Sequence, residues 1–318
     1  MTSAPTHPRP VVVWDAGGPY SLHKTLGIIG RGPGDRTMRL TPDAAWLAFN
    51  TPDGPATLGI SAHGTELRAQ AWGPGAEHAL RTVPALLGAN DDWSRFDAPA
   101  FTASLPHAAR EARRKNPGLR LPSTGRMVDA LIPAILEQKV TALQARRSFA
   151  SLVRKFGAPA PGAGEHLGVP TDLMLPPTPA QWANIPSWEW HKAGVGPQRS
   201  ATVMRVVGSA SGLERLAGLP AHEAATKMRS IPGIGVWSAA EVTQRTHGDP
   251  DLVAVGDYHL AAYVGWALAG EAVNDDGMLK LLEPWRGHRQ RIVRMLYLSG
   301  FRKPTFGPRM TIQDHSTH

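Results

Sequence analysis

The spacing of the apolar residues changes once along this chain of 318 residues, and that change limits the folds it can adopt. Before about residue 100, short apolar runs are separated by Gly, Pro and Asp, and Leu67, Ala69 and Ala71 alternate with polar residues. Alternation with a period of two is typical of half-buried β-strands. Beyond about residue 105, apolar residues recur three and four positions apart, as at Met127 and Leu131, which indicates helices. We therefore predict an antiparallel α+β domain over residues 1–100 and an all-helical region over residues 101–318.

Local patterns place the individual elements. Strands are expected at residues 11–14, 37–40, 45–49, 57–60 and 67–71, followed by a helix over 76–87. Further helices are expected at 127–136, 179–184, 198–209, 221–229, 236–246, 258–268 and 289–298. The Gly- and Pro-rich stretches 156–162 and 175–179 are expected to be loops.

The composition excludes several classes of protein. The chain has no Cys, which removes disulfide frameworks, thiol nucleophiles, Cys-ligated zinc and iron–sulfur clusters. It has no run of about 18 apolar residues, and its polar start lacks the apolar core of a signal peptide, so we expect no membrane partner. None of its 13 His residues forms an H-E-x-x-H motif, which argues against a zinc enzyme.

The charge favours a polyanionic partner without proving one. The 34 Lys and Arg residues outnumber the 26 Asp and Glu residues, for a net charge of +8, although many basic proteins bind no nucleic acid. Three basic groups in the helical region would make DNA binding salt-dependent if they shared one cleft, but each could instead be a solvated face. They are Arg113, Arg114 and Lys115; Arg146 and Arg147; and Arg286, Arg289, Arg291 and Arg294.

The segment 229–243 is the most informative of the chain. Two helices are joined by a tight Pro-Gly-Ile-Gly turn, in which Gly233 and Gly235 allow close approach to a partner. The free N–H groups at the start of the second helix suit a phosphate oxygen, although a bare helix–helix connection explains the same pattern. Asp257 follows Trp237 by 20 positions and opens another helix. There it is an N-cap, and a capping carboxylate also stays ionised and available for catalysis.

These segments resemble the helix-hairpin-helix (HhH-GPD) superfamily of DNA glycosylases, most closely the branch typified by 3-methyladenine DNA glycosylase II. The hairpin 231–239 and Asp257 match its two signatures, and the segments 127–141 and 283–297 match two further helical motifs. The resemblance implies an antiparallel-sheet domain followed by an all-α helix-hairpin-helix glycosylase domain. It also implies hydrolysis of the N-glycosidic bond of a flipped-out modified base, an alkylated purine such as 3-methyladenine, in base-excision repair. The alternatives are a glycosylase for a bulkier or non-alkylated base and a non-catalytic DNA-binding relative.

The resemblance also assigns the chemistry and the base pocket. Asp257 would stabilise the oxocarbenium-like sugar cation. Trp237 stands where bifunctional relatives carry a Lys, so a monofunctional enzyme without lyase activity is expected. The pocket, which is aromatic in the prototype, is matched here by Trp237, Glu241, Leu296 and Ile28, with Trp190 and His191 as further candidates. Glu241 is alternatively an exposed helix position, and His191 a structural residue.

The remaining expectations concern DNA and ions. The resemblance assigns the grip on a phosphate to Gly233, Ile234 and Gly235, and the plug that fills the gap left by the flipped base to Gln138 and Lys139. Arg286 is expected to bind DNA, and Lys139 is alternatively a solvated residue at a helix junction. No cofactor is required, and the carbonyls of Arg229, Ile231 and Gly233 match those that hold a Na⁺ or K⁺ ion. We expect a monomer, cytoplasmic and nucleoid-associated, whose partner is double-stranded DNA that contains a damaged base.

Overall fold

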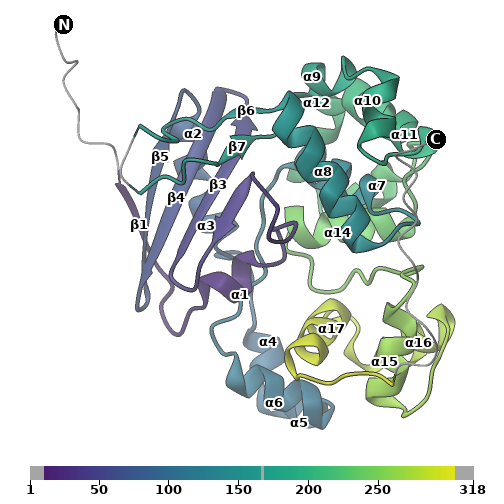
Figure 1. The fold of residues 1–318 in the computed structure, drawn as a ribbon. Helices are drawn as coiled ribbons and strands as arrows, with labels where there is room; N and C mark the ends of the chain where they lie inside the picture. The colour runs from purple at the N-terminus through teal and green to yellow at the C-terminus, as the bar shows by residue number, and fades with distance from the viewer. Residues whose placement is uncertain (1–10, 166–167, 305–318) are drawn as a thin grey trace, which may run out of the picture.

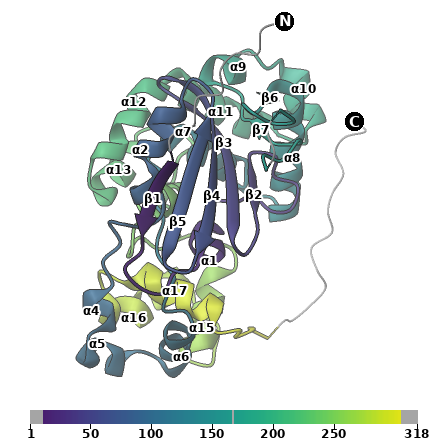
Figure 2. The ribbon, with the colours of Figure 1, turned by 90° about the vertical axis from the view of Figure 1, so that its left-hand side faces the viewer.

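The structure is a computed structural model and describes residues 11–165 and 168–304. Its N-terminal part is a five-stranded antiparallel sheet with the order β1-β5-β4-β3-β2 (Figures 1 and 2). The strands are β1 (Val11–Asp15), β2 (Met38–Leu40), β3 (Ala44–Thr51), β4 (Gly54–His63) and β5 (Glu66–Trp72). The predicted alternation is confirmed in β5, where Leu67, Ala69 and Ala71 are all buried. The N-terminal domain is therefore α+β, as the sequence predicts.

Three short helices pack against this sheet. They are α1 (Leu22–Leu26), α2 (Ala76–Arg81) and α3 (Val83–Leu86). The single helix predicted over 76–87 is thus wrong, because the chain forms two helices that meet at Thr82. Pro84 explains the break, since its ring lacks an N–H group and clashes with the carbonyl four residues earlier in a continuous helix.

The helical part has two apolar cores. The first helical cluster comprises α7 (Met127–Leu136), α8 (Ala142–Phe156), α9 (Pro179–Ala183), α10 (Ser187–Lys192), α11 (Pro197–Gly208), α12 (Ala210–Glu214) and α13 (Ala221–Met228). The second helical cluster comprises α4 (Ser94–Asp97), α5 (Pro99–Ser104), α6 (His107–Lys115), α15 (Leu260–Leu268), α16 (Asp275–Leu282) and α17 (Arg289–Leu298).

Helix α14 (Val236–Thr246) joins these two clusters. It buries Ala239 and Val242 in the first cluster and Ala240 in the second, and it runs between them in Figure 1. Its bounds and those of α17 match the prediction. Two short 3-10 helices, Arg215–Gly218 and Glu283–Trp285, complete the helical part.

Two stretches that the sequence predicts as loops pair with each other. β6 (Ala158–Pro159) and β7 (Met174–Leu175) form a small antiparallel ladder, and β7 lies beside β3 of the large sheet. Strands of two residues are too short for any alternation to be visible in the sequence. Within the described residues, no helix combines the length and the apolar character that crossing a bilayer requires.

Candidate active site

The hairpin between α13 and α14 is held in shape by its glycine and by one buried side chain. Gly233 has φ +98°, and a Cβ atom there would lie 2.3 Å from Oγ1 of Thr202, so this position excludes any larger residue. Ile234 is buried in the first helical cluster, and its N–H donates to the Ile231 carbonyl at 3.0 Å. Gly235 is exposed and carries no capping side chain, so the first N–H groups of α14 face outward.

Asp257 lies in the turn before α15, and three N–H groups hold its carboxylate. Oδ1 accepts hydrogen bonds from the backbone N–H groups of His259 (2.8 Å) and Leu260 (2.9 Å). Oδ2 accepts one from the indole N–H of Trp237 at 3.3 Å. The N-cap of α15 is His259 and not Asp257 as the sequence predicts, but Oδ1 of Asp257 still accepts the first N–H groups of the helix, and Oδ2 faces the residue that follows the hairpin. Three donors around one carboxylate suit an anion.

Glu241 and Ile28 meet through Arg245. Glu241 lies one helical turn beyond Trp237, and its Oε2 pairs with Nη1 of Arg245 at 2.8 Å. Nε of Arg245 donates to the Ile28 carbonyl, which belongs to the N-terminal domain, at 3.0 Å. The side chains of Glu241 and Arg245 are both largely buried, so Glu241 is not the exposed helix position of the alternative interpretation.

Helix α17 adds to this region Tyr297, which the sequence did not identify, and Arg294, which the sequence identified only as part of a basic group. Burial and the negative charge of Asp257 raise the pKa of Tyr297, whose ring stacks on Tyr263 at 4.7 Å and remains 52% exposed. Burial, followed by repulsion from Arg245, lowers the pKa of Arg294 to about 10. Leu296, which the sequence assigns to the pocket, is fully buried in the second helical cluster. Its chain neighbour Tyr297 is the exposed residue whose pKa the charge of Asp257 affects, and a motif does not reveal which of the two neighbours is buried.

The loop between α7 and α8 lies directly against the hairpin. The amide nitrogen of Gln138 donates to the Gly233 carbonyl (2.9 Å) and to Oγ of Ser238 (2.9 Å). Lys139 is exposed and has φ +56°, and within the described part of the chain no other non-glycine residue has a positive φ. The structure thus places Gln138 against the hairpin, with Lys139 exposed next to it in the chain.

Comparisons with known proteins identify the fold. No protein-family model and no curated protein sequence matches the chain. Among solved structures, the chain is similar to a 3-methyladenine DNA glycosylase from Archaeoglobus fulgidus, with a TM-score of 0.74 and 14% identity over 90% of this chain and 98% of that one. It is also similar to a Clostridium acetobutylicum 8-oxoguanine glycosylase/lyase in its apo form, with a TM-score of 0.67 and 11% identity over 91% and 96%.

A structure of that 8-oxoguanine glycosylase/lyase in complex with double-stranded DNA gives a TM-score of 0.60 and 12% identity over 87% of this chain and 91% of that one. This is the helix-hairpin-helix DNA glycosylase fold. The resemblance in the sequence is therefore confirmed at the level of the fold.

In this glycosylase fold, Trp190 and His191 lie far from the aspartate. Both are on α10, which lies at the opposite end of the molecule from α15 in Figures 1 and 2. Trp190 is 3% exposed and stacks on Trp182 with a ring separation of 5.6 Å. The structure does not bring these two residues together with Asp257, because an aromatic side chain in a helix can serve the core as well as a pocket.

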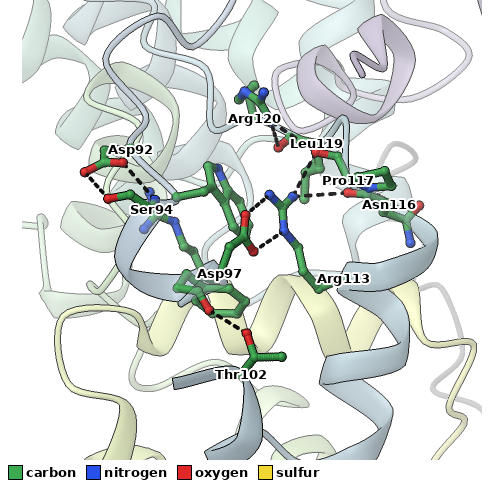
Figure 3. A network of polar contacts seen from close by, with 12 residues as sticks. Asp92, Ser94, Asp97, Thr102, Arg113, Asn116, Pro117, Leu119 and Arg120 are labelled. Atoms are coloured by element: carbon green, nitrogen blue, oxygen red, sulfur yellow. Dashed lines mark hydrogen bonds and ion pairs between the residues drawn. The ribbon is translucent and has the colours of Figure 1, made fainter. Parts of the chain in front are cut away.

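Most of the arginines in the second helical cluster have carboxylate partners. Arg113 pairs with Asp97 at 2.6 Å, donates to the carbonyls of Asn116 and Pro117, and lies over the Trp93 ring at 3.9 Å (Figure 3). Within the same cluster, Arg114 pairs with Glu111, Arg286 with Glu283, Arg289 with Asp251 and Arg291 with Asp91. The expectation that these residues form one basic DNA surface is wrong for Arg291, which is buried, and Arg286 is exposed but already paired.

The hairpin carbonyls are compatible with a monovalent cation. The Gly233 oxygen accepts the Gln138 amide, and the Ile231 oxygen accepts the Ile234 N–H. Each carbonyl oxygen has a second lone pair, so the chemistry of the donor set fits an alkali ion. Within the described residues, no group of three His, Asp or Glu side chains could hold a metal ion.

Proposed function

We propose that this protein is a monofunctional DNA glycosylase that hydrolyses the N-glycosidic bond of a modified base in double-stranded DNA. The base we propose is an alkylated purine such as 3-methyladenine, and the pathway is base-excision repair. One observation carries the proposal. The carboxylate of Asp257 is held by three N–H groups, one of them from Trp237, on the helix that the hairpin introduces.

Each step of the reaction has residues in place. The outward N–H groups of Gly235 and of the first residues of α14 bind a DNA phosphate, which fixes the protein on the backbone, and Gly233 and Ile234 shape the turn that presents them. Gln138 and Lys139 occupy the gap left by the flipped nucleotide, and the exposed tip of their loop suits that role. As the glycosidic bond breaks, positive charge develops on the sugar and the base departs with the bonding electron pair. The fixed carboxylate of Asp257 stabilises that cation until water adds to it.

Trp237 supports hydrolysis without strand cleavage. A lyase reaction needs an amine that attacks the sugar carbon, and the indole at this position offers none. Its N–H group is instead used to orient Asp257. We expect the product to be an intact strand with an abasic site.

A Na⁺ or K⁺ ion belongs to the proposal as an aid to DNA binding. The carbonyls of Arg229, Ile231 and Gly233 would hold it. Bound there, it would add positive charge where the hairpin meets a phosphate. The hydrolytic step does not depend on it.

Replacing the carboxylate by an amide tests the proposal. Asn keeps the capping oxygen for His259 and Leu260 but removes the negative charge. We expect Asp257→Asn to lower single-turnover excision from 3-methyladenine-containing duplex by about 100-fold or more while DNA affinity stays near wild type. Asp276→Asn, which removes an exposed carboxylate from the first turn of α16, is the matched control and should excise normally.

Two outcomes would contradict the proposal. If wild type releases no base from a broad panel of modified DNA yet binds it, the protein is a DNA-binding relative without hydrolysis. If wild type nicks abasic DNA at the rate of excision, the monofunctional assignment fails.

A second candidate substrate is favoured by the charged pair near Asp257. Glu241 and Arg245 lie one and two helical turns beyond Trp237, where an electron-poor alkylated base would gain more from aromatic rings. A carboxylate and a guanidinium can instead form hydrogen bonds with the edge of a neutral base. Competition between alkylated and non-alkylated lesions in one assay distinguishes the two, since the preferred class is released first.

A further inference from the structure

The turn at residues 28–31 of the N-terminal domain contacts both α14 and the end of α7. The carbonyl of Ile28 accepts a hydrogen bond from Arg245, next to Glu241. Three residues later, Nη1 of Arg31 lies 3.3 Å and 3.4 Å from the two carboxylate oxygens of Glu137, which ends α7. The side chains of Arg31 and Glu137 are only 8% and 17% exposed. This ion pair therefore lies in a largely dehydrated contact between the N-terminal domain and the first helical cluster.

The turn itself is held rigidly. Oδ2 of Asp35 accepts the backbone N–H of Arg31 at 2.9 Å. Oδ1 of the same carboxylate accepts the N–H (2.8 Å) and the hydroxyl (2.7 Å) of Thr37. Asp35 is buried, so these bonds are not exchanged with water. The backbone of Arg31 is thereby fixed, and its guanidinium can hold the carboxylate of Glu137 in a defined position.

Glu137, the ion-pair partner of Arg31, directly precedes the exposed loop. Glu137 is followed by Gln138 and Lys139, and Lys139 holds the left-handed backbone conformation that is unfavourable for a non-glycine residue. Such a conformation persists only where the surroundings impose it. Gln138 is held by the hairpin, and Thr141 and Gln144 form a capping box on the far side. Arg31 holds the residue before the loop, because its guanidinium pairs with Glu137.

We propose that Arg31 is a positioning residue of the N-terminal domain that sets the Gln138–Lys139 loop, through Glu137, for insertion into the DNA stack. The inference rests on the proposed function, because it gives that loop the role of filling the space of the flipped nucleotide. The N-terminal domain then contributes to base flipping without touching the reacting atoms. Its contribution is greatest where flipping is most costly, in a stably paired duplex.

The test compares two ion pairs made by arginines of the N-terminal domain, the buried pair Arg31–Glu137 and the exposed pair Arg39–Asp172. Arg31→Met removes the pair with Glu137, and Glu137→Gln removes it from the other side. Arg39→Met is the matched control, because Arg39 also pairs with a carboxylate, that of Asp172 in the segment between β6 and β7, but in an exposed position that is not next to the loop. Thermal unfolding of each variant establishes that it is folded, and Glu137→Gln serves if Arg31→Met is not.

The readout is the ratio of excision from a paired duplex to excision from single-stranded DNA carrying the same lesion. We expect Arg31→Met and Glu137→Gln to lower the duplex rate by about tenfold, the value of a lost charged hydrogen bond, and to leave the single-strand rate within about twofold. Arg39→Met should leave both rates unchanged. Equal losses on the two substrates, or an equal effect of Arg39→Met, would overturn the inference.

A second readout needs no glycosylase activity. The probe is a duplex with a stable abasic analogue opposite 2-aminopurine, whose fluorescence rises when a wedge unstacks it. Wild type and Arg39→Met should raise the signal, and Arg31→Met should not. If wild type raises it but excises no base, the proposed function fails and the positioning role of Arg31 stands. If Arg31→Met raises it as wild type does, the positioning role fails whatever the activity.

Discussion

In the second helical cluster most of the arginines pair with carboxylates, whereas two arginines of α11 near the hairpin donate to backbone carbonyls. Arg113, Arg289 and Arg291 each pair with an aspartate. In the first helical cluster, Arg199 donates to the carbonyl of Leu136 at 2.8 Å, and Arg205 donates to that of Pro232 at 3.4 Å.

A carboxylate cancels the charge of an arginine, but a carbonyl does not. Lys139, Arg146 and Arg147 are exposed, and they have no carboxylate within 4.0 Å among the described residues. These three residues therefore leave uncompensated positive charge on the loop and at the start of α8, although the sequence distributes basic residues over both clusters. Residue counts do not reveal this difference, because it depends on the partner of each side chain.

The largest expected effect concerns the buried pair of Arg291 and Asp91 in the second helical cluster. Both side chains are almost fully buried, and Asp91 also accepts hydrogen bonds from Trp93 and from the backbone of Leu121. Arg291→Met leaves that carboxylate uncompensated and should lower the free energy of unfolding by about 3–5 kcal/mol. Arg146→Met, on the exposed side of the comparison, should change it by less than about 0.5 kcal/mol. Urea unfolding measures the free energy of unfolding of both variants. Similar losses for the two would contradict the difference between the buried, paired arginine and the exposed one.

A pH dependence of stability should also arise from His288 in the second helical cluster. Burial, followed by repulsion from Arg291 and Arg95, lowers the pKa of His288 to about 4. Below its unfolded pKa near 6.5, the unfolded chain binds a proton that the folded chain does not, so stability is present above pH 6.5 and is lost as pH falls toward 4. The loss is at most about 3 kcal/mol. His288→Gln should flatten the profile in denaturant titrations between pH 7 and pH 4, and an unchanged profile would assign the effect to other groups.

Replacing Lys139, the loop residue with a positive φ, should change stability and activity in opposite directions. Lys139→Gly relieves the positive φ and should raise the free energy of unfolding by about 1 kcal/mol. It also removes the side chain that we propose fills the space of the flipped nucleotide, so duplex excision should fall. Urea unfolding and single-turnover excision on the same preparation test this. Faster excision by the more stable variant would contradict the role of the loop.

The smallest effect is on salt dependence. Each exposed cation that neutralises a phosphate adds about 0.9 to the slope of log K against log salt. Arg146→Ala and Arg147→Ala should each reduce that slope by about one, whereas Arg114→Ala, which removes a residue paired with Glu111, should leave it unchanged. Fluorescence anisotropy with duplex DNA at several salt concentrations gives the slopes. A reduced slope for Arg114→Ala would mean that the second helical cluster also contacts DNA phosphates.

Spacing along the chain predicted the centre of the site but not its surroundings. Trp237 and Asp257 are 20 residues apart in motifs that fix local structure, and the structure joins them by a hydrogen bond. Arg31 and Glu137 are 106 residues apart, and no local pattern records such a contact. Tyr297 was missed because the motif pointed to Leu296, and one step along a helix exchanges a core position for an exposed one. Long-range partners and helix faces are properties of packing, which periodicity predicts only in part.

The double duty of Asp257 has an evolutionary consequence. Its Oδ1 accepts the first N–H groups of α15, so a substitution that removes both oxygens would harm folding as well as the catalysis that we propose. Asn retains the capping oxygen, and a G-to-A change converts either aspartate codon into an asparagine codon. Lineages that abandon hydrolysis should therefore pass through asparagine, and a natural relative with Asn at this position would be a folded, DNA-binding protein whose catalytic loss cost it little stability.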